Sequence, residues 1–283
     1  MTPVPLARIM VEPLVRAALL EDLGRAGDLT TDAIVPAGLA ARAAMVARET
    51  GVVAGLDLAK LAFALIDPDI AVQVETGDGA TVTTGGVIAR VRGPARAILM
   101  AERTALNLLG HLSGIASATA SVVAAVRGTK AKITCTRKTT PGLRAVEKYA
   151  VRAGGGANHR FGLDDAILIK DNHIAIAGGI AEALRRARAA AGHLVKIEVE
   201  IDNLEQLKEA LDHGVDAVLL DNMSLDKLAK AVAMVDGRAM TEASGRITPE
   251  SAPAIAATGV DLISVGWLTH SARVLDIGLD FED

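Results

Sequence analysis

The sequence has very few of the residues that characterise several large classes of protein. Its 283 residues include one cysteine, three phenylalanines, one tryptophan and one tyrosine. A single cysteine excludes a disulfide framework and a thiolate metal cluster, and we expect Cys135 to be an inert buried thiol. Scarce aromatic side chains argue against binding of single-stranded nucleic acid, and a net charge of −4 argues against binding of duplexes.

Signals for export and for membrane insertion are also missing. The first ten residues, MTPVPLARIM, lack the basic segment and following apolar segment of a secretory signal. No stretch approaches ~18 apolar residues free of charge, the length that a membrane span requires. We therefore expect a cytoplasmic protein that does not enter a membrane.

Several well-known site motifs are absent as well. There is no GxxxxGK[ST], no GxGxxG after a strand and no HExxH. His159 and His173 lack zinc-site spacing and carboxylate partners of the usual kind, so a hydrogen bond to a substrate is the better prediction for His159. The acidic pair Asp164–Asp165 precedes its expected strand, whereas the diphosphate-sugar motif of the common phosphoribosyltransferase fold follows one.

The first part of the chain has the pattern of a small α+β domain. Apolar residues make up 51% of the sequence and are mostly Ala, Val, Leu and Ile, which suits helices packed on buried strands. Residues 11–24 predict an amphipathic helix, and residues 40–54 and 70–92 predict short antiparallel strands separated by glycine turns. Residues 95–126 predict a long helix, with a break near Gly110–Gly114. We place the N-terminal domain at residues 1–110.

From residue 131 the pattern changes to alternating strands and helices. Short β-branched runs occur at 131–136, 166–170, 194–201, 217–221, 238–244 and 262–266, with helical segments between them. Such alternation predicts βα units and a parallel sheet, yet about six strands are too few for a full eight-fold barrel. The predicted fold is therefore α/β: an incomplete, about six-stranded α/β barrel at 111–270, with a smaller N-terminal α+β sandwich domain. The tail, 271–283, is expected to pack back on that domain.

Polar or charged residues stand at the ends of nearly all these strands. In parallel α/β folds, ligands bind at the carboxyl edge of the sheet. A protein without a site would more often end its strands in neutral turn residues. The strand-end residues are Arg137, Lys138, Lys170, Glu200, Asp221, Ser244 and Gly266.

A local excess of positive charge surrounds the first two of these strands. Residues 127–170 contain ten Lys or Arg and only three acids. Within an acidic protein this excess indicates a pocket for a small polyanion. Arginine and lysine at the strand ends are suited to carboxylates and phosphates. We assign five of the ten to solvated faces: Arg127, Lys130, Arg144, Lys148 and Arg152.

Acids and glycines complete the predicted site. Glu200 and Asp221 end neighbouring strands and could hold Mg²⁺ or a ribose, or form a purely structural pair; Glu198 could serve either purpose. Ser244-Gly245 and Ser264-Val265-Gly266 precede helical segments, where backbone N–H groups can bind phosphate.

These residues lie in motifs that closely resemble one family. The run CTRKTTPGLRAVEKYAVRAGGGANHRFGLDDAILIKDNHI (135–174) is similar to the quinolinate phosphoribosyltransferases, also called nicotinate-nucleotide pyrophosphorylases (carboxylating). The resemblance extends over nearly the whole chain, through ALLEDLGRAGDLTTDAIV, GPARAILMAERTALNLLGHLSGIAS, KIEVEI, VLLDNM, EASGRIT and GVDLISVGWLTHS. Motifs of this length are highly specific.

The resemblance implies a reaction and roles for individual residues. Quinolinate would attack 5-phosphoribosyl-1-diphosphate, diphosphate would leave with Mg²⁺, and the 2-carboxyl group would leave as CO₂ to give nicotinate mononucleotide in NAD biosynthesis. The catalytic residues implied are Lys138, Glu200 and Asp221, the last two also as Mg²⁺ ligands. The substrate-binding residues implied are Arg103, Thr136, Arg137, His159, Arg160, Lys170, Ser244, Gly245, Arg246, Ser264, Val265, Gly266 and His270.

The resemblance also implies a homodimer, in which Arg103 completes the partner's site. Without the resemblance, Arg103 would be interpreted as a surface residue of a helix. Arg246 departs from the smaller residue expected in many relatives. Two alternatives stay open: a relative that uses nicotinate or another aromatic acid without decarboxylation, and a non-catalytic metabolite-binding barrel.

Overall fold

The computed structural model describes residues 3–282, and its internal contacts divide the chain into two compact units. The first unit contains the residues up to Ala120, Thr139–Gly155 and the residues from Leu268. The second unit contains Ser121–Lys138 and Gly156–Trp267. Each unit is thus built from separate stretches of the sequence.

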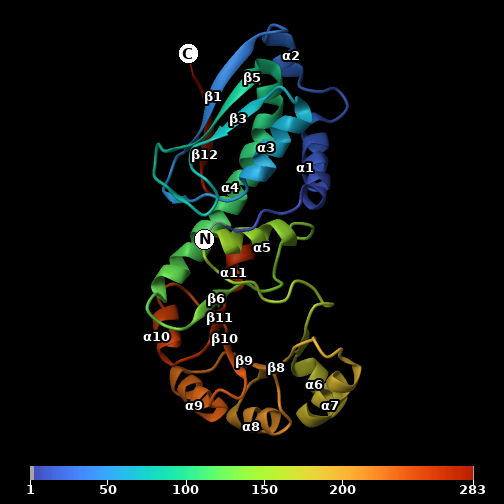
Figure 1. Cartoon of the computed structure of the whole chain (residues 1–283), viewed down its shortest axis with the longest axis vertical. Helices are drawn as coiled ribbons and strands as arrows, with labels where there is room; N and C mark the ends of the chain where they lie inside the picture. Colours follow the sequence, from blue (N-terminus) through green and yellow to red (C-terminus); the bar gives the residue numbers. More distant parts are fainter. Residues whose placement is uncertain (1–2, 283) are drawn as a thin grey trace. The chain divides into compact units, whose positions relative to one another are not determined.

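An antiparallel sheet forms the centre of the first unit (Figure 1). Its strands have the order β12-β1-β5-β3, and a separate pair joins β2 to β4. The antiparallel strands expected within 40–54 and 70–92 are present, and β12 pairs with β1 from Ala47↔Ile277 to Arg42↔Glu282. The strands are β1 (Ala40–Ala47), β2 (Gly51–Val52), β3 (Ala71–Val74), β4 (Thr81–Val82), β5 (Val87–Pro94) and β12 (Ile277–Glu282).

Helices cover this sheet, and some of them are not evident in the sequence. Helix α1 (Arg8–Leu23) corresponds to the helix expected at 11–24 and is followed by Gly24 at φ 55°. It packs against α3 (Leu56–Ile66), which the sequence analysis did not identify (Figure 1). Six of the eleven residues of α3 are buried, and its only charged residues are Asp57 and Lys60. The segment is therefore apolar on most faces and lacks the periodicity of an amphipathic helix. Helix α2 spans Leu29–Ile34.

Helix α5 (Arg144–Ala153) is buried along most of its length. Lys148, which was expected on a solvated face, has an exposed fraction of only 3%. That expectation is wrong because α5 buries a continuous run from Val146 to Val151, leaving no polar face at this position. Arg152 is exposed as expected.

Helix α4 (Ala95–Ala125) is continuous, and the break expected near Gly110–Gly114 is not present. The two glycines are instead sites of close packing. A Cβ at Gly114 would lie 2.0 Å from the carbonyl oxygen of Arg273, and one at Gly110 would lie 2.8 Å from that of Leu275. Glycine is therefore needed here so that the C-terminal segment can cross the helix surface, not to end the helix.

By length and composition alone, α4 is long and apolar enough to cross a membrane, which corrects the expectation that no segment is. Half of its most apolar window is buried inside the protein, however. Buried helices at the centre of a folded domain meet the same criterion, so a single such helix is weak support for a membrane span.

The second unit is built on a six-stranded parallel sheet with the order β6-β11-β10-β9-β8-β7. The strand that comes first along the chain, β6, pairs with the strand that comes last, β11, and within residues 3–282 no pairing joins β6 to β7. The predicted fold, an incomplete α/β barrel of about six strands, is therefore confirmed. The strands are β6 (Lys132–Thr134), β7 (Ile167–Ile169), β8 (Ile197–Ile201), β9 (Ala217–Asp221), β10 (Met240–Ser244) and β11 (Leu262–Ser264).

Helices lie around the outside of this sheet (Figure 1). Along β8, Ile197, Val199 and Ile201 are buried on one face, while Glu198 and Glu200 share the opposite face. The apolar face suits the helix layer, and the other face carries the carboxylates. The helices are α6 (Asp171–Ala177), α7 (Ile180–Ala190), α8 (Leu204–Asp212), α9 (Leu225–Val235) and α10 (Ala252–Ala257); a short helix, α11, spans Trp267–His270.

Candidate active site

The carboxyl ends of four parallel strands meet in one row of the second unit. Asp221 pairs in register with Ser244, and Ser244 pairs with Ser264. Ser264 in turn pairs with Thr134 at the end of β6. Residues in register on adjacent strands point to the same face of a sheet. The strand-end residues predicted from the sequence therefore do lie along one edge.

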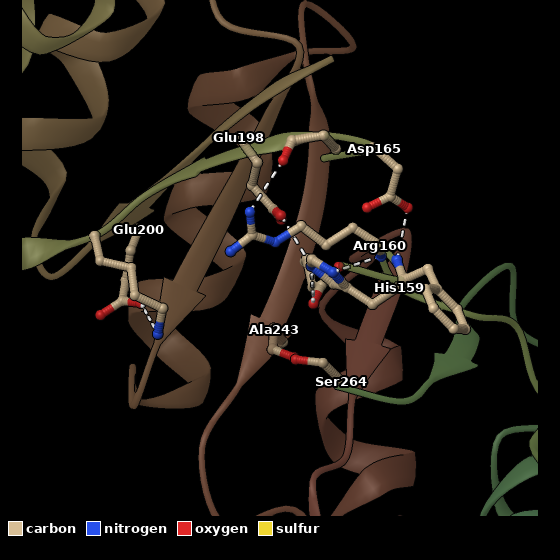
Figure 2. Close-up of polar contacts among 11 residues, drawn as sticks. His159, Arg160, Asp165, Glu198, Glu200, Ala243 and Ser264 are labelled. Carbon is tan, nitrogen blue, oxygen red and sulfur yellow. Dashed lines mark hydrogen bonds and ion pairs between the residues drawn. The ribbon is translucent and has the colours of Figure 1, made fainter. Parts of the chain in front are cut away.

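Lys170 and Glu200 form an ion pair at the end of two neighbouring strands. The Nζ atom of Lys170 lies 3.2 Å from Oε2 of Glu200 (Figure 2). Lys170 follows β7 directly, and its backbone N–H donates to Nδ1 of His173 at 2.9 Å, which fixes the first turn of α6. The Lys170 side chain is 50% exposed and that of Glu200 is 15% exposed, so the lysine stands at the mouth of the site.

The two strand-end carboxylates are suited to a magnesium ion. Glu200 on β8 is in register with Leu219 on β9, so Asp221 lies two residues further along the same face of β9. One Asp221 oxygen accepts a hydrogen bond of 2.5 Å from Nδ2 of Asn222. Carboxylate oxygens are the donors that Mg²⁺ prefers, usually one or two of them together with water and substrate phosphates. The donor set therefore fits the predicted metal.

Arg137 and Arg160 form the core of the positive cluster. Burial lowers the pKa of Arg160, and the guanidinium group of Arg137 nearby lowers it further. Each guanidinium has a buried Nε without a hydrogen-bond partner among the described residues. Nη1 of Arg160 donates to the backbone carbonyl of Ala166 at 3.0 Å, which fixes the far end of that side chain. Two adjacent cations with unused donors form a site for an anion.

His159 lies next to two carboxylates from different strands. Its Nε2 atom is 2.9 Å from Oε2 of Glu198 on β8 and 3.7 Å from Oε1 of Glu242 on β10 (Figure 2). The prediction that His159 lacks carboxylate partners is wrong, because these partners come from strands that are distant in the sequence. Burial raises the pKa of Glu242 to about 7, and the negative charge of Glu198 contributes to this shift.

Glu242 is a functional candidate that the sequence analysis did not identify. It has an exposed fraction of 2%, and its Oε1 atom has no hydrogen-bond partner within residues 3–282. The only signal in the sequence is a single acid in the middle of the strand MTEAS, on the face shared with Ser244.

The turn after β10 has the backbone geometry expected of an anion-binding loop. Gly245 has a φ of 113°, and a Cβ there would lie 2.2 Å from Oδ1 of Asn222, so only glycine fits. Arg246, the unusual residue of this loop, has a φ of 48° and is exposed. This left-handed conformation favours glycine or asparagine, which agrees with the smaller residue expected in relatives.

The other predicted residues of the second unit make local contacts. The N–H of Lys138 donates to Oγ1 of Thr136 at 3.0 Å, which shapes the turn after β6. The hydroxyl of Ser264 donates to the carbonyl of Ala243 at 3.3 Å, and the N–H of Val265 donates to the carbonyl of Thr134 at 2.9 Å. Gly266 follows at the same strand end.

Arg103 and His270 belong to the first unit. The Arg103 side chain on α4 is 62% exposed and lies 3.8 Å from Glu102. Nδ1 of His270 lies 2.6 Å from Oγ of Ser271. Their roles at the site stay predictions.

Known proteins are similar to this chain over almost its whole length. The family described as "Quinolinate phosphoribosyl transferase, C-terminal domain" matches residues 115–280, and "Quinolinate phosphoribosyl transferase, N-terminal domain" matches residues 28–113. The nicotinate-nucleotide pyrophosphorylase [carboxylating] of Mycobacterium leprae is 51% identical over 94% of this chain and 95% of its own. The probable enzyme of that name from Bacillus subtilis is 48% identical over 96% and 93%.

A solved structure gives the same result for the fold. The nicotinate-nucleotide pyrophosphorylase from Francisella tularensis superposes with a TM-score of 0.94 at 39% identity, covering 98% of both chains. Sequence and fold therefore agree over both halves of the molecule, and this chain belongs to the quinolinate phosphoribosyltransferase family.

Proposed function

We propose that the protein transfers the phosphoribosyl group of 5-phosphoribosyl-1-diphosphate to quinolinate, releasing CO₂ and diphosphate and forming nicotinate mononucleotide. The single observation that supports this best is the pair formed by Arg137 and Arg160. Two neighbouring guanidinium groups, each with a buried Nε that has no partner in the described part of the chain, are suited to the adjacent carboxylates of a pyridine dicarboxylate. Lys170 at the mouth of the site supplies a third positive charge.

The opposite side of the site is suited to the second substrate. Glu200 and Asp221 would hold Mg²⁺, which when bound neutralises charge on the leaving diphosphate. The two carboxylates would also lie beside a ribose that becomes positively charged in the transition state. The glycine turn at Gly245 would receive a phosphate group, because its backbone approaches without a side chain in the way.

Decarboxylation requires little from the protein itself. Once the ring nitrogen of quinolinate is bonded to the ribose, its positive charge stabilises the electron pair left on C2 when the 2-carboxyl group leaves as CO₂, and C2 then takes up a proton from water to give nicotinate mononucleotide. The arginines and Lys170 need only hold the ring in the orientation for attack, and a positioned nucleophile accounts for much of the barrier reduction in such reactions. Lys138, beside both substrates, would balance charge on the leaving diphosphate.

The partners and the location of the enzyme remain predictions. A homodimer would let Arg103 of each subunit contribute to the other's site, and the exposed position of this side chain is compatible with that role. We expect the enzyme to work in the cytoplasm and to bind neither nucleic acid nor a membrane.

A substrate panel tests the function directly. The protein would be incubated with phosphoribosyl diphosphate, Mg²⁺ and either quinolinate or nicotinate, and pyridine nucleotide would be measured. We expect product from quinolinate only. Product from nicotinate alone would favour the non-decarboxylating alternative, and absence of product with both acids would favour a metabolite-binding barrel.

A further inference from the structure

A short exposed loop, FGLDD (residues 161–165), joins Arg160 to the segment that leads into β7. Four of its five residues are exposed, among them the apolar Phe161 at 47% and Leu163 at 73%. A loop that is exposed to this degree gains little order from packing, so its conformation depends on hydrogen bonds. It contains the acidic pair Asp164–Asp165, to which the proposed function gives no role.

The Asp165 carboxylate holds the first two residues of this loop (Figure 2). The backbone N–H of Phe161 donates to Oδ2 at 2.6 Å, and the backbone N–H of Gly162 donates to Oδ1 at 2.9 Å. Hydrogen bonds to an ionised acceptor are stronger than those between neutral groups. Both oxygens of Asp165 therefore act on the main chain directly after Arg160.

The side chain of Arg160 is tied to the other end of the loop. Its Nη1 donates to the carbonyl of Ala166 at 3.0 Å. The next residue, Ile167, donates its N–H to the carbonyl of Lys196 at 3.0 Å, which joins this segment to the sheet. Arg160 is thus held at two points, by its main chain through Asp165 and by its guanidinium through Ala166. Its buried Nε, without a partner among the described residues, is left for an anion.

The neighbouring acid, Asp164, provides a natural comparison. It is exposed like Asp165, and its side chain lies over the loop, because a Cβ at Gly162 would be 2.4 Å from its Oδ1. Within residues 3–282, however, only Asp165 of the pair accepts the N–H groups of Phe161 and Gly162. The two acids therefore have the same charge and differ in their contacts.

Charge alone would make Asp165 unfavourable for anion binding. Burial lowers the pKa of Arg160, the guanidinium of Arg137 lowers it further, and the negative charge of Asp165 opposes both effects. A negative charge this close also repels an anion bound at the same guanidinium. If charge were its only effect, removal of Asp165 would strengthen anion binding.

We propose that Asp165 is a positioning residue for quinolinate binding, because its carboxylate orders the loop that holds Arg160 at the anion site. It acts through the main chain of Phe161 and Gly162. The identity of the anion rests on the proposed function, whereas the two hydrogen bonds of Asp165 do not depend on it.

Three variants separate positioning from charge. Asp165→Ala removes both acceptors, and Asp164→Ala removes the same charge and the same atoms from the adjacent residue. Asp165→Asn removes the charge but keeps Oδ1 as an acceptor for one of the two N–H groups. Urea unfolding checks that each variant is folded, and Asp165→Asn carries the test if Asp165→Ala is not.

Steady-state kinetics give the first readout. We expect Asp165→Ala to raise KM for quinolinate about tenfold and Asp165→Asn about threefold, because binding must then order the loop. Their kcat and their KM for phosphoribosyl diphosphate should stay within about twofold of the wild type, since binding of one substrate is weakened. Asp164→Ala should leave KM for quinolinate unchanged or slightly lower.

Amide hydrogen exchange, followed by NMR, gives a readout that needs no substrate. In the free protein, the amides of Phe161 and Gly162 should exchange at least about tenfold faster in Asp165→Ala than in the wild type. Their rates in Asp164→Ala should match those of the wild type, because this variant keeps both hydrogen bonds.

Three results would overturn the proposal. The first is equal exchange of these two amides in the wild type and in Asp165→Ala. The second is a KM for quinolinate that is unchanged or lower in Asp165→Ala, and the third is an equal rise in Asp164→Ala. A wild type that neither binds nor turns over quinolinate would contradict the proposed function instead, and the exchange rates would still show whether Asp165 orders the loop.

Discussion

The ammonium group of Lys170 lies 3.2 Å from a carboxylate oxygen of Glu200, across the ends of two paired strands. The proposed function assigns these two groups to different ligands, quinolinate for the lysine and Mg²⁺ or ribose for the glutamate. In the structure they neutralise each other. Substrate binding is therefore expected to exchange one ion pair for two new interactions.

This relationship predicts that Lys170→Met has opposite effects on two ligands. Quinolinate should bind more weakly, with KM raised about tenfold through loss of a charged hydrogen bond. The Mg²⁺ concentration for half-maximal activity should fall, because Glu200 no longer has a competing cation. Titrations of both ligands in the variant and in Lys208→Met, an exposed residue of α8, measure this.

An unchanged or higher Mg²⁺ requirement in Lys170→Met would contradict the exchange. Chelation of Mg²⁺ should abolish activity in the wild type and in Lys208→Met, and added Mg²⁺ should restore it in both.

The strand ends could be predicted from the sequence, but the contacts between them could not. Runs such as KIEVEI and VLLDN predict parallel strands with acids at their ends, because β-branched residues and a period of two are local signals. The pairing of His159 with Glu198 joins residues 39 positions apart, and Glu242 approaches from a third strand. Such contacts depend on strand order, which local periodicity does not contain.

Two helices and two glycines also show that local sequence patterns cannot predict contacts between distant segments. Helix α3 was missed because it is buried on most faces, and α6 has no amphipathic pattern of its own because none of its seven residues is buried. Gly110 and Gly114 suggested a helix break, since glycine is a poor helix former. Only the structure shows the C-terminal segment that crosses them.

A complementation experiment tests the predicted homodimer. Arg103→Ala and Lys138→Ala should each be inactive, because each removes a charge that the site needs. After subunit exchange in an equal mixture, about a quarter of the sites would combine an intact Lys138 with an intact Arg103 from the partner, so activity should recover to about a quarter of the wild type. Absence of recovery, with exchange verified by mass spectrometry of mixed dimers, would contradict a shared site.

The pKa of Glu242 predicts how stability changes with pH. Since burial raises this pKa to about 7, above the ordinary value of 4.5, the folded state holds a proton that the unfolded state releases between these values. The resulting stabilisation of the folded state is at most about 3 kcal/mol. It is complete below about pH 4.5 and is lost as the pH rises through about 7. Glu242→Gln cannot titrate, so its free energy of unfolding should fall less between pH 5 and pH 8.

Urea unfolding of the two proteins at several pH values measures this difference. Parallel pH profiles for the wild type and Glu242→Gln would show that Glu242 does not carry the proton.

The close contact at Gly114 predicts a loss of stability that helix propensity alone would not. In an ordinary helix, Gly→Ala stabilises by up to about 1 kcal/mol. At Gly114 the new Cβ would meet the carbonyl oxygen of Arg273 at 2.0 Å, so we expect destabilisation by about 2 kcal/mol. Gly77→Ala is the matched control, because its Cβ would have no atom within 4 Å. A Gly114→Ala protein as stable as the control would contradict the packing of the C-terminal segment against α4.

In the proposed reaction quinolinate is the acceptor, and its 2-carboxyl group is lost in the same turnover. Quinolinate carrying carbon-14 in the 2-carboxyl group would be incubated with the protein, phosphoribosyl diphosphate and Mg²⁺. One labelled CO₂ should be released for each unlabelled nicotinate mononucleotide formed. Label retained in the nucleotide, or nucleotide formed from nicotinate but not from quinolinate, would contradict it.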